Sequence, residues 1–383
     1  MTRKRARPHH LALSLIVALV VGVLAPNARA YDTPAHAAIL FDLQSGQELY
    51  IKNPDVPLPP ASMSKLMTVL MVFERLADGS LSLDDTFAVS EKAWRKGGSK
   101  MFVEVGSRVR VEDLLHGIIV QSGNDACIVV AEALGGSEEA FAEQMTKRGR
   151  ELGLTNSTFK NASGWPDPEH LMSVRDLARL ATIIIEQYPE YYEIFSEKEF
   201  TFGGIRQYAR NPLLHRDLGA DGLKTGFTDD AGYGLTASAV RDGRRLVMVI
   251  AGLERPEVRA RESERLLEYG FRQFRNYQLF ASGEAVDQAD VWLGSTDSVP
   301  LVVQDDLWVS LTPEARRKLE VKVVYDGPVP APVEDGSPLA QLEIAAPGLE
   351  PRRVPLVAGE AVQAATVFGR VTSAIGYLIW GPS

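Results

Sequence analysis

The sequence predicts an α+β domain followed by a small all-β module. In the first part, strand patterns lie at both ends of a region whose middle is mostly helical, which differs from the strand-helix alternation of a parallel sheet. From about residue 290, short apolar runs are separated by Pro and Gly, and ten of the 22 prolines lie beyond that point. With 383 residues, 45% hydrophobic and 24% charged, the chain has the size and composition of a soluble protein of two or three domains.

The first thirty residues contain the three parts of a cleaved export signal in order. A basic segment at 3–7 precedes an apolar run at 11–24, and Ala28-Arg29-Ala30 supplies the small residues of a cleavage site. The apolar run is shorter than the roughly 20 residues that a membrane-spanning helix needs. We therefore predict that residues 1–30 are a signal peptide and that the mature protein is exported.

The α+β domain is predicted to begin with a hairpin and a buried helix. Apolar runs at 37–41 and 49–51 flank Ser45-Gly46, a pattern typical of a β-hairpin. After a Pro-rich loop, residues 66–73 are almost all apolar. They predict a helix buried on nearly all sides, beginning near Ala61 and Ser62 and ending at Asp78-Gly79.

The middle of the domain is predicted to be helical and its end to return to strands. Ser173 and Asp176 have the spacing of a capping box, so a helix is predicted to begin there. Two β-rich runs, 232–241 and 244–253, meet at Asp242-Gly243, the strongest short hairpin signal. The other predicted helices cover 111–120, 125–134, 137–152 and 257–274. We place this domain at residues 31–282.

The all-β module is predicted over residues 283–362. Its strand candidates cover 291–293, 299–303, 307–311, 321–325, 339–344 and 353–357. Beyond it, residues 363–383 carry apolar side chains at helical spacing. Two interpretations remain open for this tail: an amphipathic helix that anchors the protein in a membrane interface, and a helix docked on the β module.

Charge and composition exclude several classes of function. Residues 1–30 hold five basic groups and no acidic ones, so the rest of the chain carries a formal charge of −14 and is a poor partner for nucleic acid. The single Cys127 excludes an internal disulfide framework and, within an apolar run, is predicted to be a buried thiol. No His-Glu-x-x-His occurs, so His170 and His215 are predicted to be surface or loop residues, and no metal or other cofactor is expected.

A nucleophile and a base are suggested at the start of the buried helix. Ser62-Met63-Ser64-Lys65 places Ser62 and Lys65 one turn apart on the same face. A serine hydroxyl needs a nearby base to become a nucleophile, and a lysine desolvated in an apolar helix has a depressed pKa suited to that role. Alone, Ser-x-x-Lys is weak, because about one such match per chain of this size is expected by chance.

Two further motifs strengthen this hypothesis. Ser122-Gly123-Asn124 lies between two predicted helices, and Lys224-Thr225-Gly226 is predicted to open a strand. The three motifs in this order are the signature set of penicillin-binding proteins and class A β-lactamases. The sequence resembles the D-alanyl-D-alanine carboxypeptidases of the low-molecular-mass penicillin-binding protein type over nearly the whole mature chain. Its matching segments include 60–68, 121–127, 161–168 and 221–228.

The resemblance implies an antiparallel sheet flanked by helices with a mostly helical inserted subdomain, as in serine β-lactamases. It makes Ser62 the acylated nucleophile and Lys65 its base. Ser122 would pass a proton to the leaving amine, and Asn124 would hold the substrate's peptide carbonyl. The loop between residues 89 and 101, which borders the site, looks shorter than in well-known members of the family.

The resemblance also implies how the substrate is held. Lys224 and Thr225 would face its terminal carboxylate, and the strand at Gly226 would run close to its backbone. The N–H groups of Ser62 and Phe227 would form the oxyanion hole. Two arginines are candidates for the carboxylate site, Arg210 and, with a fainter match, Arg259.

The implied reaction removes the terminal D-Ala from peptidoglycan stem pentapeptides in the periplasm, with β-lactams as inhibitors that acylate the same serine. A β-lactamase is disfavoured, because no Glu-x-x-Leu-Asn segment lies between the second and third motifs. A Ser-His-Asp hydrolase lacks its Gly-x-Ser-x-Gly elbow. Two alternatives stay open: a D,D-endopeptidase that cuts crosslinks, and a non-catalytic module for penicillin sensing or wall binding.

Overall fold

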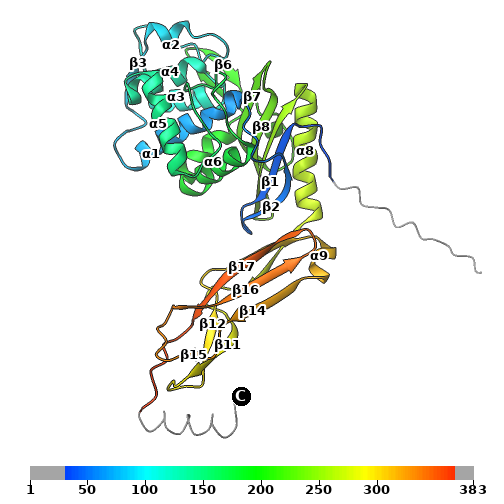
Figure 1. The fold of residues 1–383 in the computed structure, drawn as a ribbon. Helices are drawn as coiled ribbons and strands as arrows, with labels where there is room; N and C mark the ends of the chain where they lie inside the picture. The colour runs from blue at the N-terminus through cyan, green and yellow to red at the C-terminus, as the bar shows by residue number, and fades with distance from the viewer. Residues whose placement is uncertain (1–30, 367–383) are drawn as a thin grey trace, which may run out of the picture. The chain divides into compact units, whose positions relative to one another are not determined.

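The computed structural model describes residues 31–366 (Figure 1). The predicted signal peptide lies outside the described residues, as does the predicted C-terminal helix from residue 367 onward. Among helices of residues 31–366, none combines the length and apolarity needed to cross a membrane.

A five-stranded antiparallel sheet forms the centre of the first domain. Its strands are β1 (Ala37–Asp42), β2 (Gln47–Lys52), β7 (Ala220–Thr228), β8 (Gly232–Arg241) and β9 (Arg244–Leu253). Their order in the sheet is β2-β1-β9-β8-β7, and every neighbouring pair is antiparallel. Both hairpins predicted from the sequence are confirmed. The last strand, β7, lies at an edge of the sheet and has one neighbour.

Helices cover both faces of this sheet. On one face lies the helical region that the sequence predicted, and on the other lies α8 (Pro256–Gln273); α6 and α8 both pack on β9 (Figure 1). The helical region contains α1 (Lys65–Ala77), α3 (Val111–Ile119), α4 (Asn124–Gly135), α5 (Glu138–Glu151) and α6 (Val174–Gln187). Its position between β2 and β7 in the chain confirms an α+β domain with a mostly helical insertion.

The buried helix has the environment that its apolar sequence predicts. Ten of the 13 residues of α1 are buried, and helices α3, α4, α5 and α6 all pack against it. The segment before it, Ala61–Ser64, is a 3-10 turn rather than the first turn of an α-helix. The cap predicted for α6 is confirmed, because the Ser173 side chain accepts a hydrogen bond from the Asp176 N–H at 3.1 Å.

Several short elements have no counterpart in the sequence prediction. The short strands form two separate two-stranded sheets, β3 with β4 and β5 with β6. Their bounds, with the short helices, are β3 Thr86–Ala88, α2 Glu91–Arg95, β4 Arg108–Arg110, α7 Pro189–Tyr192, β5 Glu199–Phe202, β6 Ile205–Tyr208 and two 3-10 turns, Glu193–Ser196 and Pro212–His215. Such short strands carry little hydrophobic periodicity, so tertiary packing decides them.

The second domain is a β module, as predicted. Its six-stranded sheet has the order β14-β16-β17-β12-β11-β15, and β10 pairs separately with β13. The bounds are β10 Arg275–Phe280, β11 Ala285–Trp292, β12 Ser298–Val302, β13 Leu307–Leu311, α9 Pro313–Arg317, β14 Glu320–Tyr325, β15 Val329–Pro330, β16 Pro338–Ala346 and β17 Leu349–Ala358. The boundary predicted after residue 282 stays a prediction, and the pairing of β10 with β13 favours an earlier one.

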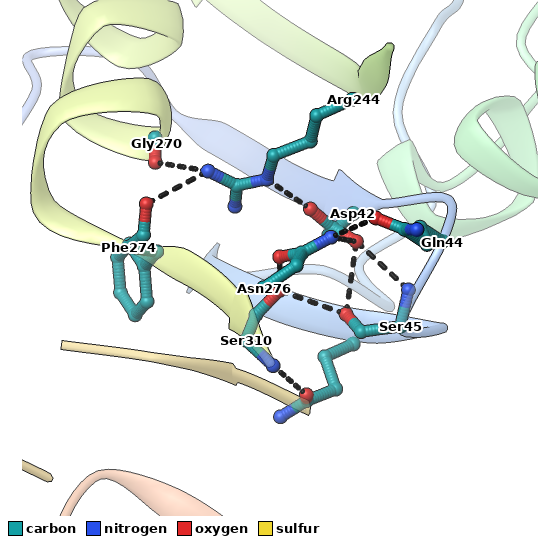
Figure 2. A network of polar contacts seen from close by, with 9 residues as sticks. Asp42, Gln44, Ser45, Arg244, Gly270, Phe274, Asn276 and Ser310 are labelled. Atoms are coloured by element: carbon teal, nitrogen blue, oxygen red, sulfur yellow. Dashed lines mark hydrogen bonds and ion pairs between the residues drawn. The ribbon is translucent and has the colours of Figure 1, made fainter. Parts of the chain in front are cut away.

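A buried carboxylate organises the junction between the two domains (Figure 2). Asp42, at the end of β1, has no exposed surface. Its Oδ2 accepts from Arg244 Nε at 2.6 Å, and its Oδ1 accepts from the Ser45 N–H at 2.8 Å and from Asn276 Nδ2 at 3.0 Å. Arg244 also donates to the carbonyl of Phe274 at 2.8 Å, just beyond the end of α8.

Hydrogen bonds from the β1–β2 hairpin continue into the second domain. The hydroxyls of Ser45 and Ser310 are 2.9 Å apart, and the Ser310 N–H donates to Gln47 Oε1 at 2.5 Å. Ser310 lies in β13 and also contacts Asn276 of β10. The five-stranded sheet, α8 and the β module are therefore connected through one set of polar groups.

We predict that Asp42→Ala lowers the free energy of unfolding by about 3–5 kcal/mol, because it leaves the Arg244 guanidinium, with 13% of its side chain exposed, without its anionic partner. Glu314→Ala, which breaks an exposed pair with Lys318 (2.8 Å), is the matched control and is expected to change it by less than about 0.5 kcal/mol. Denaturant unfolding of the full chain measures both. Equal values for the two variants would contradict a central role for Asp42.

Candidate active site

The 3-10 turn before α1 brings the predicted nucleophile and base together. Residues three apart are eclipsed in a 3-10 helix, so the side chains of Ser62 and Lys65 extend from the same side. Lys65 Nζ lies 2.8 Å from Ser62 Oγ. Ser62 is partly exposed, whereas Lys65 has no exposed surface. The hydroxyl can thus be reached by a substrate while the amine is shielded from water.

Two further acceptors hold the Lys65 amine from other parts of the helical region. Its Nζ donates to Asn124 Oδ1 at 2.8 Å and to the carbonyl oxygen of Ser163. A neutral amine has two N–H groups and one lone pair. If the two N–H groups point to Asn124 and Ser163, the lone pair faces the Ser62 hydroxyl and can accept its proton.

The electrostatic surroundings favour this neutral form. The pKa of Lys65 is lowered to about 8, mainly by burial and also by the positive charges of Arg210 and Lys96. Cys127 and Asp125 act in the opposite direction on the same pKa. The net result is a lysine that loses its proton near neutral pH, as a general base must.

Asn124 is held from both its side chain and its backbone. It is the first residue of α4, and its Nδ2 donates to the carbonyl of Gly97 at 2.9 Å. Its N–H donates to the carbonyl of Ser99 at 2.7 Å. With Nδ2 engaged by Gly97, the Oδ1 atom faces Lys65. The loop after α2 therefore fixes the orientation of this amide.

The loop at 161–164 places a backbone carbonyl against the Lys65 amine. Asn161 Oδ1 accepts from the N–H groups of Ser163 (3.1 Å) and Trp165 (2.9 Å), which closes a tight turn. Gly164 has a φ of +75°, and a Cβ there would overlap the carbonyl oxygen of Ala61. Only glycine combines this φ with so close an approach to the turn that carries Ser62.

The third motif lies in the middle of β7. Lys224 and Thr225 are buried, with 2% and 6% of their surfaces exposed. The sequence prediction that this motif opens a strand is wrong, because β7 begins at Ala220 and pairs with β8 along its full length. The pKa of Lys224 is lowered well below its usual value, first by burial and then by the charge of Lys65.

Gly226 allows this strand to pack directly on the turn that carries Ser62. A Cβ at Gly226 would be 2.8 Å from the carbonyl oxygen of Pro60 and 3.2 Å from the Cβ of Ala61. The next residue, Phe227, is 47% exposed, and its ring stacks on Tyr233 with 4.1 Å between the centroids. The strand thus borders the site along its open edge.

The other predicted residues surround this centre at different depths. Ser122 is buried in the turn between α3 and α4, with a φ of +68°. Arg210 donates to Ser99 Oγ at 2.7 Å. The guanidinium of Arg259 in α8 lies over the Tyr233 ring, 5.8 Å from its centroid. Both arginines lower the pKa of Lys224 through their charge, which places them near the third motif.

Sequence reasoning missed three parts of the site. The carbonyl of Ser163 and those of Gly97 and Ser99 come from the backbone, and a backbone group has no side-chain signal. The one signal in the sequence is the glycine at position 164, because glycine is the residue that most readily adopts a positive φ. Cys127, predicted to be a buried thiol, is fully buried, and its burial raises the pKa to about 12.

The histidines and acidic residues form no metal site among residues 31–366. His215 is exposed, at the end of a 3-10 turn. His170 is in a loop, as expected, but it is buried, and burial lowers its pKa to about 4. It packs on Phe159 with 5.7 Å between the ring centroids.

Comparison with known proteins identifies the family. Residues 24–254 match the family of D-alanyl-D-alanine carboxypeptidase peptidases, and residues 274–364 match the C-terminal domain of penicillin-binding protein 5. The chain belongs to the D-alanyl-D-alanine carboxypeptidase family. It is therefore a peptidase, and the family resemblance predicted from the sequence is confirmed.

Full-length relatives and solved structures agree with this membership. The chain is 37% identical over 353 residues to D-alanyl-D-alanine carboxypeptidase DacC of Escherichia coli, covering 90% of this chain and 88% of the relative. Penicillin-binding protein 5 from Haemophilus influenzae superposes with a TM-score of 0.81 at 34% identity, covering 87% of this chain and 99% of that one. Both domains are included, so the predicted fold is confirmed.

A relative with a different printed activity covers a smaller part of the chain. A D-alanyl-D-alanine endopeptidase of Pseudomonas aeruginosa is 30% identical over 240 residues, which is 58% of this chain and 74% of the relative.

We predict that Gly164→Ala disrupts the contact between Ser163 and Lys65 and lowers the rate of acylation of the protein by a fluorescent penicillin by at least about tenfold, because both its φ and the carbonyl of Ala61 reject a Cβ. Gly348→Ala is the matched control. Gly348 has a φ of +78° with nothing within 4 Å, so that variant tests the backbone strain alone. If both variants acylate at the original rate, the loop is not needed to position the base.

Proposed function

We propose that Ser62 is the nucleophile of a carboxypeptidase that removes the terminal D-Ala from peptidoglycan stem pentapeptides. The observation that carries the proposal is the 2.8 Å contact between Ser62 Oγ and the fully buried amine of Lys65. Membership of the carboxypeptidase family supplies the reaction, and this contact supplies the chemistry that begins it.

Acylation begins with transfer of the Ser62 proton to Lys65. The hydroxyl oxygen then attacks the carbonyl carbon of the D-Ala-D-Ala amide and forms a tetrahedral intermediate. The N–H groups of Ser62 and Phe227 donate to its oxyanion, which requires β7 to lie close to the 3-10 turn. The close packing at Gly226 supports that requirement.

Collapse of the intermediate needs a proton on the departing amine. Ser122 is the group that we assign to relay it, because it lies two residues before Asn124, which contacts the base. Asn124 has a second role in this scheme. Its amide, fixed by Gly97, orients Lys65 and faces the peptide carbonyl of the substrate.

The terminal carboxylate identifies the substrate in this scheme. Lys224 and Thr225, midway along β7, bind it, and Arg210 and Arg259 add positive potential. A free carboxylate at the end of the chain is what separates a carboxypeptidase substrate from an internal peptide bond. Water then hydrolyses the acyl-enzyme and releases the shortened stem. β-Lactams resemble the same terminus and would acylate Ser62 without rapid release.

A D,D-endopeptidase activity remains the second candidate, since the same groups can cut a crosslink. The relatives that include the β module are named carboxypeptidases, whereas the endopeptidase relative matches 58% of this chain. A module for sensing or wall binding would not need an intact Ser62 and Lys65 pair. The carboxypeptidase hypothesis therefore has the stronger support.

The site of action follows from the export signal. We propose that residues 1–30 direct the protein to the periplasm, where its substrate lies, and that residues 363–383 attach it to the outer face of the inner membrane. No cofactor enters the mechanism, and the acidity of the mature chain argues against nucleic acid as a partner.

The assignment of the nucleophile is tested by incubating the mature protein with a pentapeptide that ends in D-Ala-D-Ala and measuring free D-alanine. Ser62→Ala is expected to lower the rate by at least about a thousandfold. Ser64→Ala removes a second serine from the same turn, whose hydroxyl contacts the Ala61 carbonyl at 3.0 Å, and is expected to stay within about tenfold. Release by Ser62→Ala at the original rate would refute the assignment.

The role of Lys65 predicts a pH dependence. The base acts in its neutral form, so the rate of acylation by a penicillin should rise up to about tenfold per pH unit below about pH 8 and level off above it. Lys65→Arg is expected to be inactive across the range, because a guanidinium stays protonated. A rate that is independent of pH on both sides of 8 would exclude Lys65 as the base.

A further inference from the structure

An exposed groove with aromatic side chains lies beside the helical region, outside the site described above. It has a volume of about 530 Å³ and is formed by α2, the loop after it, β4 and the β5–β6 hairpin. We call it the aromatic groove. The residues that define it are Trp94, Lys100, Phe102, Arg108, Phe202 and Ile205.

The apolar side chains of the aromatic groove are unusually open to solvent. Trp94 is 42% exposed, Phe102 50% and Ile205 42%. They come from three separate segments of the chain and meet on one surface. Contiguous exposed apolar surface of this kind marks a binding site more often than isolated exposed side chains do.

Phe102 is held at the surface in a conformation that costs energy. Its φ of +70° is in the left-handed region, which a bulky residue rarely adopts. The carboxylate of Asp125, fully buried, accepts hydrogen bonds from the N–H groups of Met101 and Phe102, both at 2.9 Å. These bonds fix the backbone so that the ring stays outside. Strain maintained in this way is typical of functional positions.

The same part of the chain carries positive charge. Residues 91–110 contain six Lys and Arg and two Glu, a formal charge of +4 in a chain of −9. Lys100 and Arg108 line the groove, with Glu104 as the one acidic residue among those that line it. Lys100 donates to the backbone carbonyl of Trp94 at 2.5 Å, which ties this cation to the helix that carries the Trp94 ring.

The aromatic groove is structurally connected to the active site. The loop that separates them accepts both hydrogen bonds that fix Asn124, through Gly97 and Ser99. Asp125, the next residue of α4, holds Phe102. Two consecutive residues of α4 therefore position a group of the site and a ring of the groove.

We propose that the aromatic groove binds the glycan strand of peptidoglycan, with its sugar rings on Trp94 and Phe102. The C–H face of a pyranose ring is weakly positive and packs on the negative face of an aromatic ring. The stem peptides attached to the strand carry free carboxylates, which are complementary to Lys100 and Arg108. The proposal rests on the proposed function, since it takes the polymer that carries the cleaved stem as its ligand.

Occupancy of the groove raises the local concentration of stem peptides near Ser62 without touching the reacting atoms. The groove should therefore matter for polymeric peptidoglycan and not for a free pentapeptide. This difference separates the inference from the proposed function, because the free pentapeptide tests the chemistry alone.

The test compares Trp94→Ala combined with Phe102→Gly against the unchanged chain. Glycine accepts the φ at position 102, so the variant removes the ring without adding strain. Binding to isolated sacculi is measured by cosedimentation, and D-alanine release is measured from sacculi and from the free pentapeptide. Trp292→Ala, which removes a 50% exposed ring from β11 in the other domain, is the matched control.

We expect the double variant to bind sacculi at least about tenfold more weakly, about 1.4 kcal/mol, and to release D-alanine from them correspondingly more slowly. Turnover of the free pentapeptide should stay within about twofold. Binding to sacculi should weaken as salt is raised, because charge contributes to it. The Trp292→Ala variant should match the unchanged chain in every measurement.

Several results would overturn the proposal. The first is unchanged binding and turnover of sacculi by the double variant. The second is an equal loss on the free pentapeptide, which would place the two rings in the catalytic machinery. The third is loss of binding to vesicles of anionic phospholipid while binding to sacculi is retained, which would assign the groove to a membrane surface. An equal effect of Trp292→Ala would show that any exposed ring has this influence.

Discussion

The active site depends on keeping a basic amine out of water. Lys65 has no exposed surface, and a buried amine without partners is costly, so each of its hydrogen-bonding positions needs a fixed acceptor or donor. Those partners come from the 3-10 turn, the start of α4 and the loop at 161–164. The packing of the helical region around α1 is what holds these three segments together. The apolar core around α1 therefore also fixes the polar partners of Lys65.

Much of this arrangement could be predicted from the sequence. The unbroken apolar stretch predicted a helix buried on nearly all sides, and ten of its 13 residues are buried. Asp242-Gly243 predicted the turn between β8 and β9, and the apolar run around Cys127 predicted a buried thiol. In each case, the residues that favour the local structure are also the residues that its surroundings in the fold require. The local pattern was therefore sufficient to predict the structure.

What could not be predicted has no local pattern. The Ser163 carbonyl belongs to the backbone, and Asp42 is 202 residues from Arg244 in the chain. The β5–β6 hairpin and the left-handed Phe102 are imposed by distant contacts, in the second case by Asp125. The prediction that Lys224 opens a strand was wrong for the same reason. Pairing with β8, rather than the motif, sets where β7 begins.

The state of Cys127 has a practical consequence. It is the one cysteine in the sequence, and its thiol is enclosed and holds its proton because burial raises the pKa to about 12. Thiol-specific reagents act on the exposed thiolate, so they should pass this residue by in the folded protein. A cysteine introduced at any surface position would then be the sole target for a spectroscopic label. With one such cysteine in each domain, distances between the two domains could be followed in solution without first removing a native cysteine from the core.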